Sequence, residues 1–246
     1  QQYINYLIQT KLLGKKVNTD SIFSKQRRLE TIEDVVKEKF APFIGKTDTE
    51  ILSKLNSDLG KKSKSYKRLI VNRILGVNSN HIEELEKANI TLKVITLEHT
   101  GNLKESISFP AFDYKDLVND LWYDEEDEVM TDFHLQLETK KFLFVVFQKQ
   151  KNNDDIILRK TMFWNFPMKD IGKEKKVWQK TIDCIKEGRY EDLPKIRDSF
   201  VAHVRPHGKD SNDTIETPQK TQEMKRCFWL NAKYIQNAIE KDKDQG

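Results

Sequence analysis

Three side chains that could do chemistry alternate along the run His203-Val-Arg-Pro-His207. In an extended segment, alternate side chains point to the same face, so His203, Arg205 and His207 would lie on one face together. Arg is the side chain that most often recognises guanine, because its fork matches O6 and N7 in the major groove of DNA. The run therefore predicts a strand end that reads bases, and a charged surface strand end is the plainer alternative.

His203 and His207 also have the spacing of two zinc ligands on a helix. Pro206 disfavours a helix there, because proline lacks the backbone N–H and its ring clashes with the preceding turn. No cluster of His or Cys adds a third ligand nearby. We therefore expect no metal site in this run.

Some residues of a metal-dependent nuclease site are present within and just before one expected strand. Such a site needs at least two carboxylates on a divalent ion and a Lys that handles the attacking water. A common arrangement is an acid followed by Glu-x-Lys on a strand. Here Lys93 stands at the Lys position, Thr91 at the Glu position, and Glu83, Glu84 or Glu86 could supply the first acid. A neutral hydroxyl is a poor ligand for a hard cation, so the pattern predicts half a metal site.

A lysine-rich loop, residues 59–65, precedes an amphipathic helix expected over residues 66–77. The lysines of the loop and the first lysine of the helix could contact a phosphate backbone. A solvated charged face is the plainer alternative and, on this segment alone, the better one. The lysines concerned are Lys61, Lys62, Lys64 and Lys67.

Composition limits the class of protein. The 246 residues, 33% charged and 37% hydrophobic, suit a globular protein with a well-hydrated surface. The net charge of +4 permits nucleic-acid binding without requiring it. The two cysteines, Cys184 and Cys227, give no disulfide framework, which favours a reducing cytoplasm. The sequence shows no membrane-spanning apolar run and no signal peptide, and Gln1 in place of Met indicates a piece of a longer protein.

The elements that must position these side chains follow from the hydrophobic periodicity. In the first third of the chain, apolar residues recur at helical spacing. The expected helices cover residues 3–12, 31–44, 51–55 and 66–77. Thr31 is the expected N-cap of the second helix, and Thr47 or Thr49 that of the third.

Strands dominate the rest of the expected pattern. The alternating segment 90–97 predicts a half-buried strand, with residues 106–109 as its hairpin partner. Residues 141–147 are nearly all apolar, which predicts a central strand buried on both faces, with residues 156–163 as its hairpin neighbour. Further expected elements are helices over residues 112–122 and 173–187, a strand into His203, and a strand-to-helix or all-helical element over residues 224–239.

Together these elements predict one α/β or α+β domain over residues 1–246, helical across residues 1–88 and sheet-containing across residues 89–246. We expect flanking helices and two lobes around a groove that binds DNA. The mixed sheet would be built from the strands of Ile90, Phe142, Ile156 and Val201.

Five runs, in order along nearly the whole chain, carry a resemblance to a known family. The runs are Ile32-Glu-Asp-Val-Val-Lys-Glu-Lys-Phe-Ala-Pro-Phe43, Lys104-Glu-Ser-Ile-Ser-Phe109, Phe142-Leu-Phe-Val-Val146, His203-Val-Arg-Pro-His207 and Phe228-Trp-Leu-Asn231. The match also includes the expected N-terminal helix with Leu13-Gly14 and, after the last run, Tyr234-Ile235. These segments resemble the GATC-cutting type II restriction endonucleases of the MutH family, which include a staphylococcal enzyme. The last two runs are fairly specific. The resemblance implies a MutH-like, restriction-endonuclease-like fold.

The resemblance also implies a division of labour. Enzymes of this kind hold two MutH-like modules in one polypeptide. The N-terminal module cuts with Mg²⁺, and the C-terminal module binds a second copy of the site as an allosteric effector. This chain is similar to the C-terminal module, so the resemblance implies no cofactor for the chain itself.

The cutting residues carry over only incompletely. MutH-like nucleases use an Asp, then a Glu, then a Lys at a spacing that falls here on Glu84, Thr91 and Lys93. The middle acid is absent and the first acid is Glu instead of Asp. The resemblance therefore implies that these positions are degenerate and that the chain does not cut.

The base-contacting residues carry over better. In MutH-like enzymes they belong to an Arg-Pro-Lys run and to a Tyr within Phe-Tyr-Leu, which here read Arg205-Pro206-His207 and Phe228-Trp229-Leu230. The resemblance implies DNA contacts by Arg205, His207 and Trp229, with His203 beside them. Trp229 has no hydroxyl to donate, so a place in the core is its plainer alternative.

The expected function is sequence-specific binding of double-stranded DNA, GATC by resemblance, as a non-catalytic effector. The alternative is a metal-dependent endonuclease that uses Glu83 or Glu84 with Lys93 and a displaced acid such as Glu98 or Glu105. A dimerisation module with vestigial DNA contacts is a third possibility. The expected partners are double-stranded DNA, the catalytic N-terminal domain of the same polypeptide, and a second copy of the chain on DNA, in a bacterial cytoplasm and without a membrane.

Overall fold

The computed structural model describes residues 20–23, 31–61, 63–125 and 129–242, and the chain divides into two compact units. The first unit comprises Gln1–Asn102 and Lys140–Asn165, and the second comprises Leu103–Thr139 and Phe166–Gly246. Each unit is therefore built from two separate stretches of the chain. The helix predicted over residues 3–12 lies outside the described residues, as do Leu13-Gly14 and Lys62.

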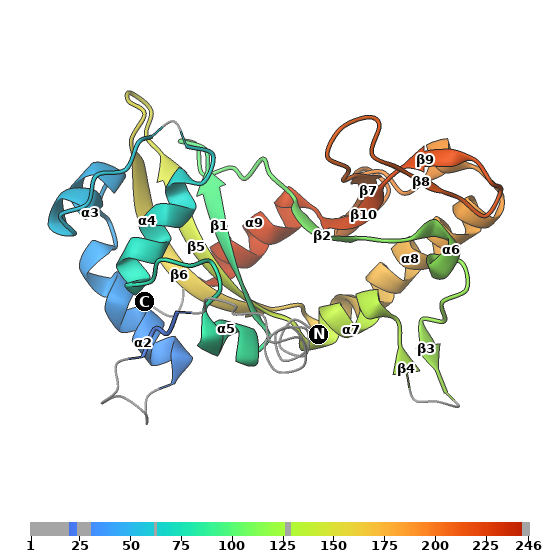
Figure 1. Ribbon diagram of the computed structural model, residues 1–246, viewed down its shortest axis with the longest axis horizontal. Helices are drawn as coiled ribbons and strands as arrows, with labels where there is room; N and C mark the ends of the chain where they lie inside the picture. The colour runs from blue at the N-terminus through green and yellow to red at the C-terminus, as the bar shows by residue number, and fades with distance from the viewer. Residues whose placement is uncertain (1–19, 24–30, 62, 126–128, 243–246) are drawn as a thin grey trace, which may run out of the picture. The chain divides into compact units, whose positions relative to one another are not determined.

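The first unit contains a three-stranded mixed sheet in the order β1-β5-β6 (Figure 1). The strands are β1 (Ile90–Leu97), β5 (Lys141–Lys149) and β6 (Ile156–Asn165). β1 runs parallel to β5, and β6 pairs with β5 antiparallel as a hairpin. Residues 142–147 of β5 are all buried, which confirms the predicted central strand and its hairpin neighbour.

Helices of the first unit pack against one face of this sheet. They are α2 (Ile32–Phe40), α3 (Asp48–Lys54), α4 (Tyr66–Leu75) and α5 (Glu83–Lys87), with a 3-10 turn, η2 (Ala41–Phe43), after α2. Buried apolar side chains of these helices form one core with Leu143, Val145 and Phe147 of β5. The helix α5 is an element that the hydrophobic pattern did not predict.

Strand periodicity then decides where the side chains of β1 point. Leu92 and Val94 pack against the core under the helices. Because side chains alternate along a strand, Thr91 and Lys93 belong to the opposite face of the sheet. In the parallel register, Thr91 lies beside Phe142 of the central strand.

Local signals set the helix ends. Thr31 caps α2 by accepting a backbone N–H, as predicted. Thr47, and not Thr49, caps α3 in a capping box. The side chains of Thr47 and of the third helical residue, Glu50, each accept a hydrogen bond from the other residue's backbone N–H. The predicted second helix is too long, because α2 ends at Phe40 and Pro42 offers no N–H to continue it.

The second unit contains an antiparallel sheet in the order β2-β10-β7. Its strands are β2 (Ile107–Ala111), β10 (Arg226–Leu230) and β7 (Ala202–Pro206). Two short hairpins pair β3 (Tyr123–Asp124) with β4 (Val129–Met130) and β8 (Thr214–Glu216) with β9 (Gln222–Met224). The central strand β10 pairs with both β2 and β7, so the sheet brings the His203 run beside the Phe228 run.

Two predictions about strand pairing are wrong. The segment 106–109 is not the hairpin partner of 90–97, because β2 pairs with β10. The His203 strand does not join the mixed sheet of the first unit, because β7 also pairs with β10. The alternation of apolar residues specifies which face of a strand is buried, and it does not specify the partner strand.

The helices of the second unit follow the prediction more closely. They are α6 (Tyr114–Leu117), α7 (Asp132–Thr139), α8 (Ile171–Lys186) and α9 (Ala232–Lys241), with 3-10 turns η3 (Met168–Asp170) and η4 (Tyr190–Asp192). α8 confirms the helix predicted over 173–187, and β10 followed by α9 confirms the strand-to-helix alternative. α6 is much shorter than the helix predicted over 112–122. Phe133 of α7 stacks on Phe228 of β10, with 4.1 Å between ring centroids.

Glu174 of α8 is a fully buried acid. It is 0% exposed, and neither carboxylate oxygen has a hydrogen-bond partner within the described residues of the chain. Burial, followed by the nearby charge of Asp170, raises the pKa of Glu174 to about 8. The side chain is therefore largely protonated at neutral pH.

The observed architecture is an α+β fold with a mixed sheet and flanking helices, as predicted. Among the helices of the described residues, none is long and apolar enough to cross a membrane. The single domain around a DNA-binding groove stays a prediction.

Candidate nucleic-acid interface

The pairing of β7 with β10 places Arg205 on an aromatic platform. In the antiparallel register, Arg205 lies opposite Cys227 and His203 lies opposite Trp229. The Arg205 guanidinium carbon lies 4.3 Å from the centroid of the Trp229 ring, which is a cation–π contact. Arg205 remains exposed, and Trp229 is half-buried. Trp229 therefore restricts the guanidinium while the donor fork faces solvent.

His207 completes this face of the strand end. Its ring stands nearly perpendicular to the Trp229 ring, with 5.3 Å between centroids and an interplanar angle of 78°. The backbone N–H of His207 donates to the carbonyl of Lys225 at 2.8 Å, which continues the strand pairing. The structure thus brings together Arg205, His207 and Trp229, and it confirms that the first two share a face.

His203 lies in the interior instead. It is 4% exposed, and its Nδ1 lies 2.5 Å from Oδ1 of Asn231. Asn231 in turn donates from Nδ2 to the Ser199 carbonyl at 2.6 Å. Burial lowers the pKa of His203, outweighing its bond to Asn231. This position favours a role in holding β7 against the start of α9 over the predicted direct contact with DNA.

Asn231 is a supporting residue whose role the sequence reasoning missed. It lies at the end of the Phe228-Trp-Leu-Asn231 run and at the N-cap position of α9. An Asn that directly follows an apolar strand and precedes a helix is a typical cap signal, and that signal could have singled it out. The structure adds its bridge from His203 to Ser199, which no local pattern could indicate.

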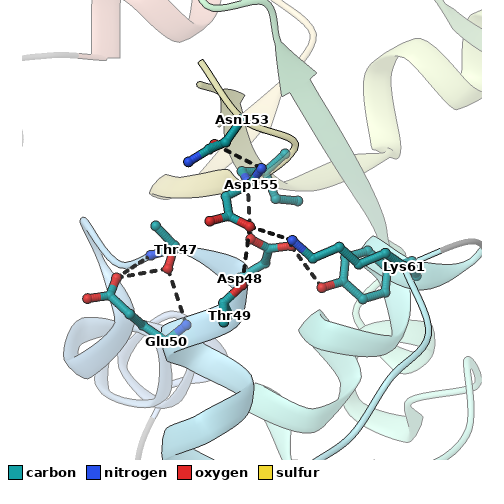
Figure 2. A network of polar contacts seen from close by, with 9 residues as sticks. Thr47, Asp48, Thr49, Glu50, Lys61, Asn153 and Asp155 are labelled. Carbon is teal, nitrogen blue, oxygen red and sulfur yellow. Dashed lines mark hydrogen bonds and ion pairs between the residues drawn. The ribbon is translucent and has the colours of Figure 1, made fainter. Parts of the chain in front are cut away.

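Lys61 of the basic loop is engaged within the first unit (Figure 2). Its ammonium contacts Asp155 and lies 3.4 Å from Oδ2 of Asp48. Asp48 is 1% exposed and also accepts from the Tyr66 hydroxyl at 2.8 Å and from the backbone N–H of Ile156 at 3.2 Å. The hydrogen bond to Asp155 raises the pKa of Lys61. Lys61 therefore ties the loop to α3 and to the start of β6.

The other lysines of this segment differ in exposure. Lys67 donates to the hydroxyl of Thr96 at 2.7 Å, which links α4 to β1. Lys64 is exposed, and the region of the chain that the structure describes shows no ion pair for it. Of the four predicted phosphate contacts, Lys62 lies outside the described residues. Of the three described lysines in this set, Lys64 is thus the one best placed to meet an external phosphate.

Among the described residues, the positions expected to be degenerate catalytic residues form no metal site. Glu84 of α5 accepts hydrogen bonds from the Ser21 hydroxyl and, at 3.1 Å, from the Ile22 backbone N–H. The Thr91 hydroxyl is buried and has no hydrogen-bond partner among the residues described. Burial, together with the nearby charge of Lys93, lowers the pKa of Lys140. These two cations therefore lie close together.

The displaced acids of the endonuclease alternative are paired with lysines or belong to the other unit. Glu83 pairs with Lys87, and Glu98 pairs with Lys149 at 2.9 Å. Glu105 belongs to the second unit, whereas Thr91 and Lys93 belong to the first. Within residues 20–23, 31–61, 63–125 and 129–242, no group of three or more His, Cys, Asp or Glu could hold a metal ion. The donor set at Thr91 therefore does not fit Mg²⁺.

Comparison with known proteins identifies a relative. No family model matches the chain. The chain is 27% identical to the type II restriction enzyme Sau3AI of Staphylococcus aureus, across 97% of this chain and 57% of that enzyme. It thus spans a little over half of the enzyme's length. The comparison confirms the resemblance drawn from the sequence motifs, and the assignment to an effector half stays a prediction.

Proposed function

We propose that this chain binds double-stranded DNA in a sequence-specific way, as the non-cutting effector half of a type II restriction endonuclease. The observation that carries the proposal is the exposed Arg205 guanidinium stacked on Trp229 at the end of β7. The target GATC comes from the family resemblance. Such a role places the chain in the bacterial cytoplasm, in one polypeptide with a catalytic N-terminal domain.

Arg205 is suited to base recognition because its contact with Trp229 orients the guanidinium in the absence of DNA. A guanidinium resting on an indole ring keeps a defined plane and loses less conformational freedom on binding. Its outward N–H groups can then reach O6 and N7 of one guanine in the major groove. His207, whose ring stands nearly perpendicular to the same indole, can reach a neighbouring base edge or a phosphate.

Binding without cutting follows from the carboxylates. Hydrolysis of a phosphodiester by this class of site needs a divalent ion that polarises the phosphate and generates hydroxide. Glu84 is occupied by Ser21 and Ile22, and Thr91 offers only a hydroxyl. The endonuclease alternative would need several converging ligands, and the described residues contain no group of three or more His, Cys, Asp or Glu that could hold a metal ion.

A gel shift with GATC and scrambled duplexes tests the binding claim. We expect a clear preference for the GATC duplex, and equal affinity for both duplexes would overturn the proposal. Incubation of the chain with GATC plasmid in Mg²⁺ or Mn²⁺ tests the non-cutting claim. We expect intact plasmid, and nicked or linear product that disappears in Lys93→Ala would instead establish the endonuclease alternative.

A further inference from the structure

Arg68 of α4 is fixed against the edge strand β1. Its Nε donates to Oδ1 of Asn80 at 3.2 Å, one terminal nitrogen donates to the Asn80 carbonyl at 3.1 Å, and the other reaches the Leu92 carbonyl at 3.5 Å. Asn80 is itself held by Asn72, which is 2% exposed and donates from Nδ2 to the same Oδ1 at 3.0 Å. The exposed Asn80, held in place by the buried Asn72, therefore orients this guanidinium.

Among the described residues, no acid balances the charge of Arg68. Arg68 is partly buried, and burial alone lowers its pKa, with no carboxylate acting in the opposite direction. Its hydrogen-bond acceptors within the described chain are an amide side chain and two backbone carbonyls. Guanidinium groups withdrawn from water are normally paired with an acid. A fixed, uncompensated cation of this kind indicates an anion that comes from outside the chain.

A cavity of about 350 Å³ adjoins this guanidinium, and its lining includes Arg68, Asn80, His81, Thr91 and Leu92. The Thr91 hydroxyl is buried, with no hydrogen-bond partner among the described residues, and its side chain belongs to the face of the sheet opposite the helices, so the donor group is the guanidinium of Arg68. Glu86 is the acid among the described lining residues, and its carboxylate already lies 2.7 Å from Nδ1 of His81. The cavity therefore offers donors to an anion.

The cavity also adjoins one part of the degenerate nuclease pattern, because its lining includes Thr91 and Leu92, though neither Glu84 nor Lys93. Leu92 lies between Thr91 and Lys93, and a backbone carbonyl is a normal ligand for a hard cation. Here the Leu92 carbonyl faces the Arg68 guanidinium. The Leu92 carbonyl is thus already in contact with a permanent organic cation. A guanidinium can attract a phosphate oxygen, but it cannot lower the pKa of a bound water as a metal does.

We propose that this cavity binds a backbone phosphate of the DNA without metal, with the Arg68 guanidinium supplying the charge and the hydrogen-bond donors. The proposal rests on the proposed function, since it names the group of the bound DNA that meets the first unit. It assigns to the cavity next to Thr91 the task of binding a phosphate without hydrolysis.

The salt dependence of binding tests the proposal, with the whole chain and GATC or scrambled duplexes in EDTA. Each phosphate contact contributes about 0.9 to the slope of log K against log salt. Arg68→Ala should lower the magnitude of that slope by about 0.9 for both duplexes. The loss of affinity caused by the substitution should therefore be about eightfold greater at about 0.1 M salt than at about 1 M salt. Arg73→Ala is the matched control, because Arg73 lies on the same helix and donates to Asn78 at 2.7 Å. Its slope should equal that of the wild type.

Neutral methylphosphonate substitution, one phosphate at a time in the GATC duplex, locates the contact with the unaltered protein. At one position the substitution should weaken the wild-type chain and leave Arg68→Ala, or Arg68→Gln if the alanine variant does not fold, unaffected. Arg68→Lys should keep most of the slope. An unchanged slope in Arg68→Ala, or the absence of any coupled position, would overturn this proposal. If the GATC preference still depended on Arg205, the proposed function would stand without it.

Discussion

Base recognition depends on a single guanidinium in the proposed function. Replacing Arg205 with Ala removes the fork and leaves Trp229 and the sheet in place. We expect the preference for GATC over an altered duplex to fall by about 1–3 kcal/mol, which is the range for one bidentate guanine contact. Competition binding with both duplexes measures this. Arg197→Ala is a suitable control, because its side chain is 79% exposed and belongs to the same unit. An unaltered preference in Arg205→Ala would contradict the assignment.

The lysines of the basic loop should separate into two kinds. Lys64→Ala should weaken all duplexes alike and flatten the salt dependence, because Lys64 is exposed and can meet a phosphate. Lys61→Ala should mainly lower the free energy of unfolding, by up to about 1 kcal/mol, because its half-exposed ammonium pairs with Asp155 and Asp48. Urea unfolding and salt-dependent binding on both variants measure the two effects. The reverse pattern would show that Lys61 leaves its ion pairs with Asp155 and Asp48 to bind DNA.

Some features of the candidate site could be predicted from residues and others could not. The alternation of a strand predicted that Arg205 and His207 share a face, because that depends only on local geometry. The burial of His203 depends on Asn231 and on the depth of the sheet, which no local pattern contains. Arg68 gave no signal in the sequence, because a lysine- and arginine-rich helix resembles any solvated helix until its neighbours are known.

At the scale of elements, α8 carries a buried carboxyl that should make stability depend on pH. Folding raises the pKa of Glu174 from 4.5 to about 8, so the folded state binds a proton that the unfolded state has released. The associated stability is complete below pH 4.5 and is lost as pH rises through about 8. The expected slope is about −1.4 kcal/mol per pH unit within that range.

Urea unfolding at several pH values checks this expectation. Glu174→Gln should remove the decline, and Glu187→Gln, which alters an exposed acid directly after α8, should retain it. The contribution of Glu174 is best measured above pH 6.5, because below that pH the titration of His203 changes the free energy of unfolding in the opposite direction. Its folded pKa is depressed, so its contribution is present above 6.5 and is lost as pH falls. A wild-type stability that rose between pH 6.5 and 8 would refute the assignment for Glu174.

Single elements were predicted well because their signals are local. A few neighbouring residues are enough to specify the apolar run of β5, the caps Thr31 and Thr47, and the apolar stripe of α8. The partners of β2 and β7 were mispredicted because both pair with β10, which lies far along the chain. Burial patterns constrain the faces of such strands, and the choice among distant partners depends on packing of the whole unit.

At the scale of the molecule, the proposed function predicts indifference to divalent metals. Removal of metal with EDTA should leave the affinity for GATC duplex unchanged at constant ionic strength, because the degenerate positions offer too few carboxylates. Titration calorimetry with Mn²⁺ and thermal melting with and without Mg²⁺ provide the measurement. Saturable binding of Mn²⁺ that Thr91→Ala or Glu84→Gln abolished would contradict it.

The chain crosses between its two units three times, after residues 102, 139 and 165. During synthesis, β1 leaves the ribosome before the whole stretch Leu103–Thr139, and the central strand β5 that it pairs with follows only afterwards. The helices of the first unit must therefore wait, with their apolar faces exposed, until the first stretch of the other unit has emerged. Domains made of one continuous stretch can fold as they emerge. Here a nascent chain that stops anywhere before Ile156 contains neither unit complete. Such truncated products should therefore aggregate readily and bind chaperones.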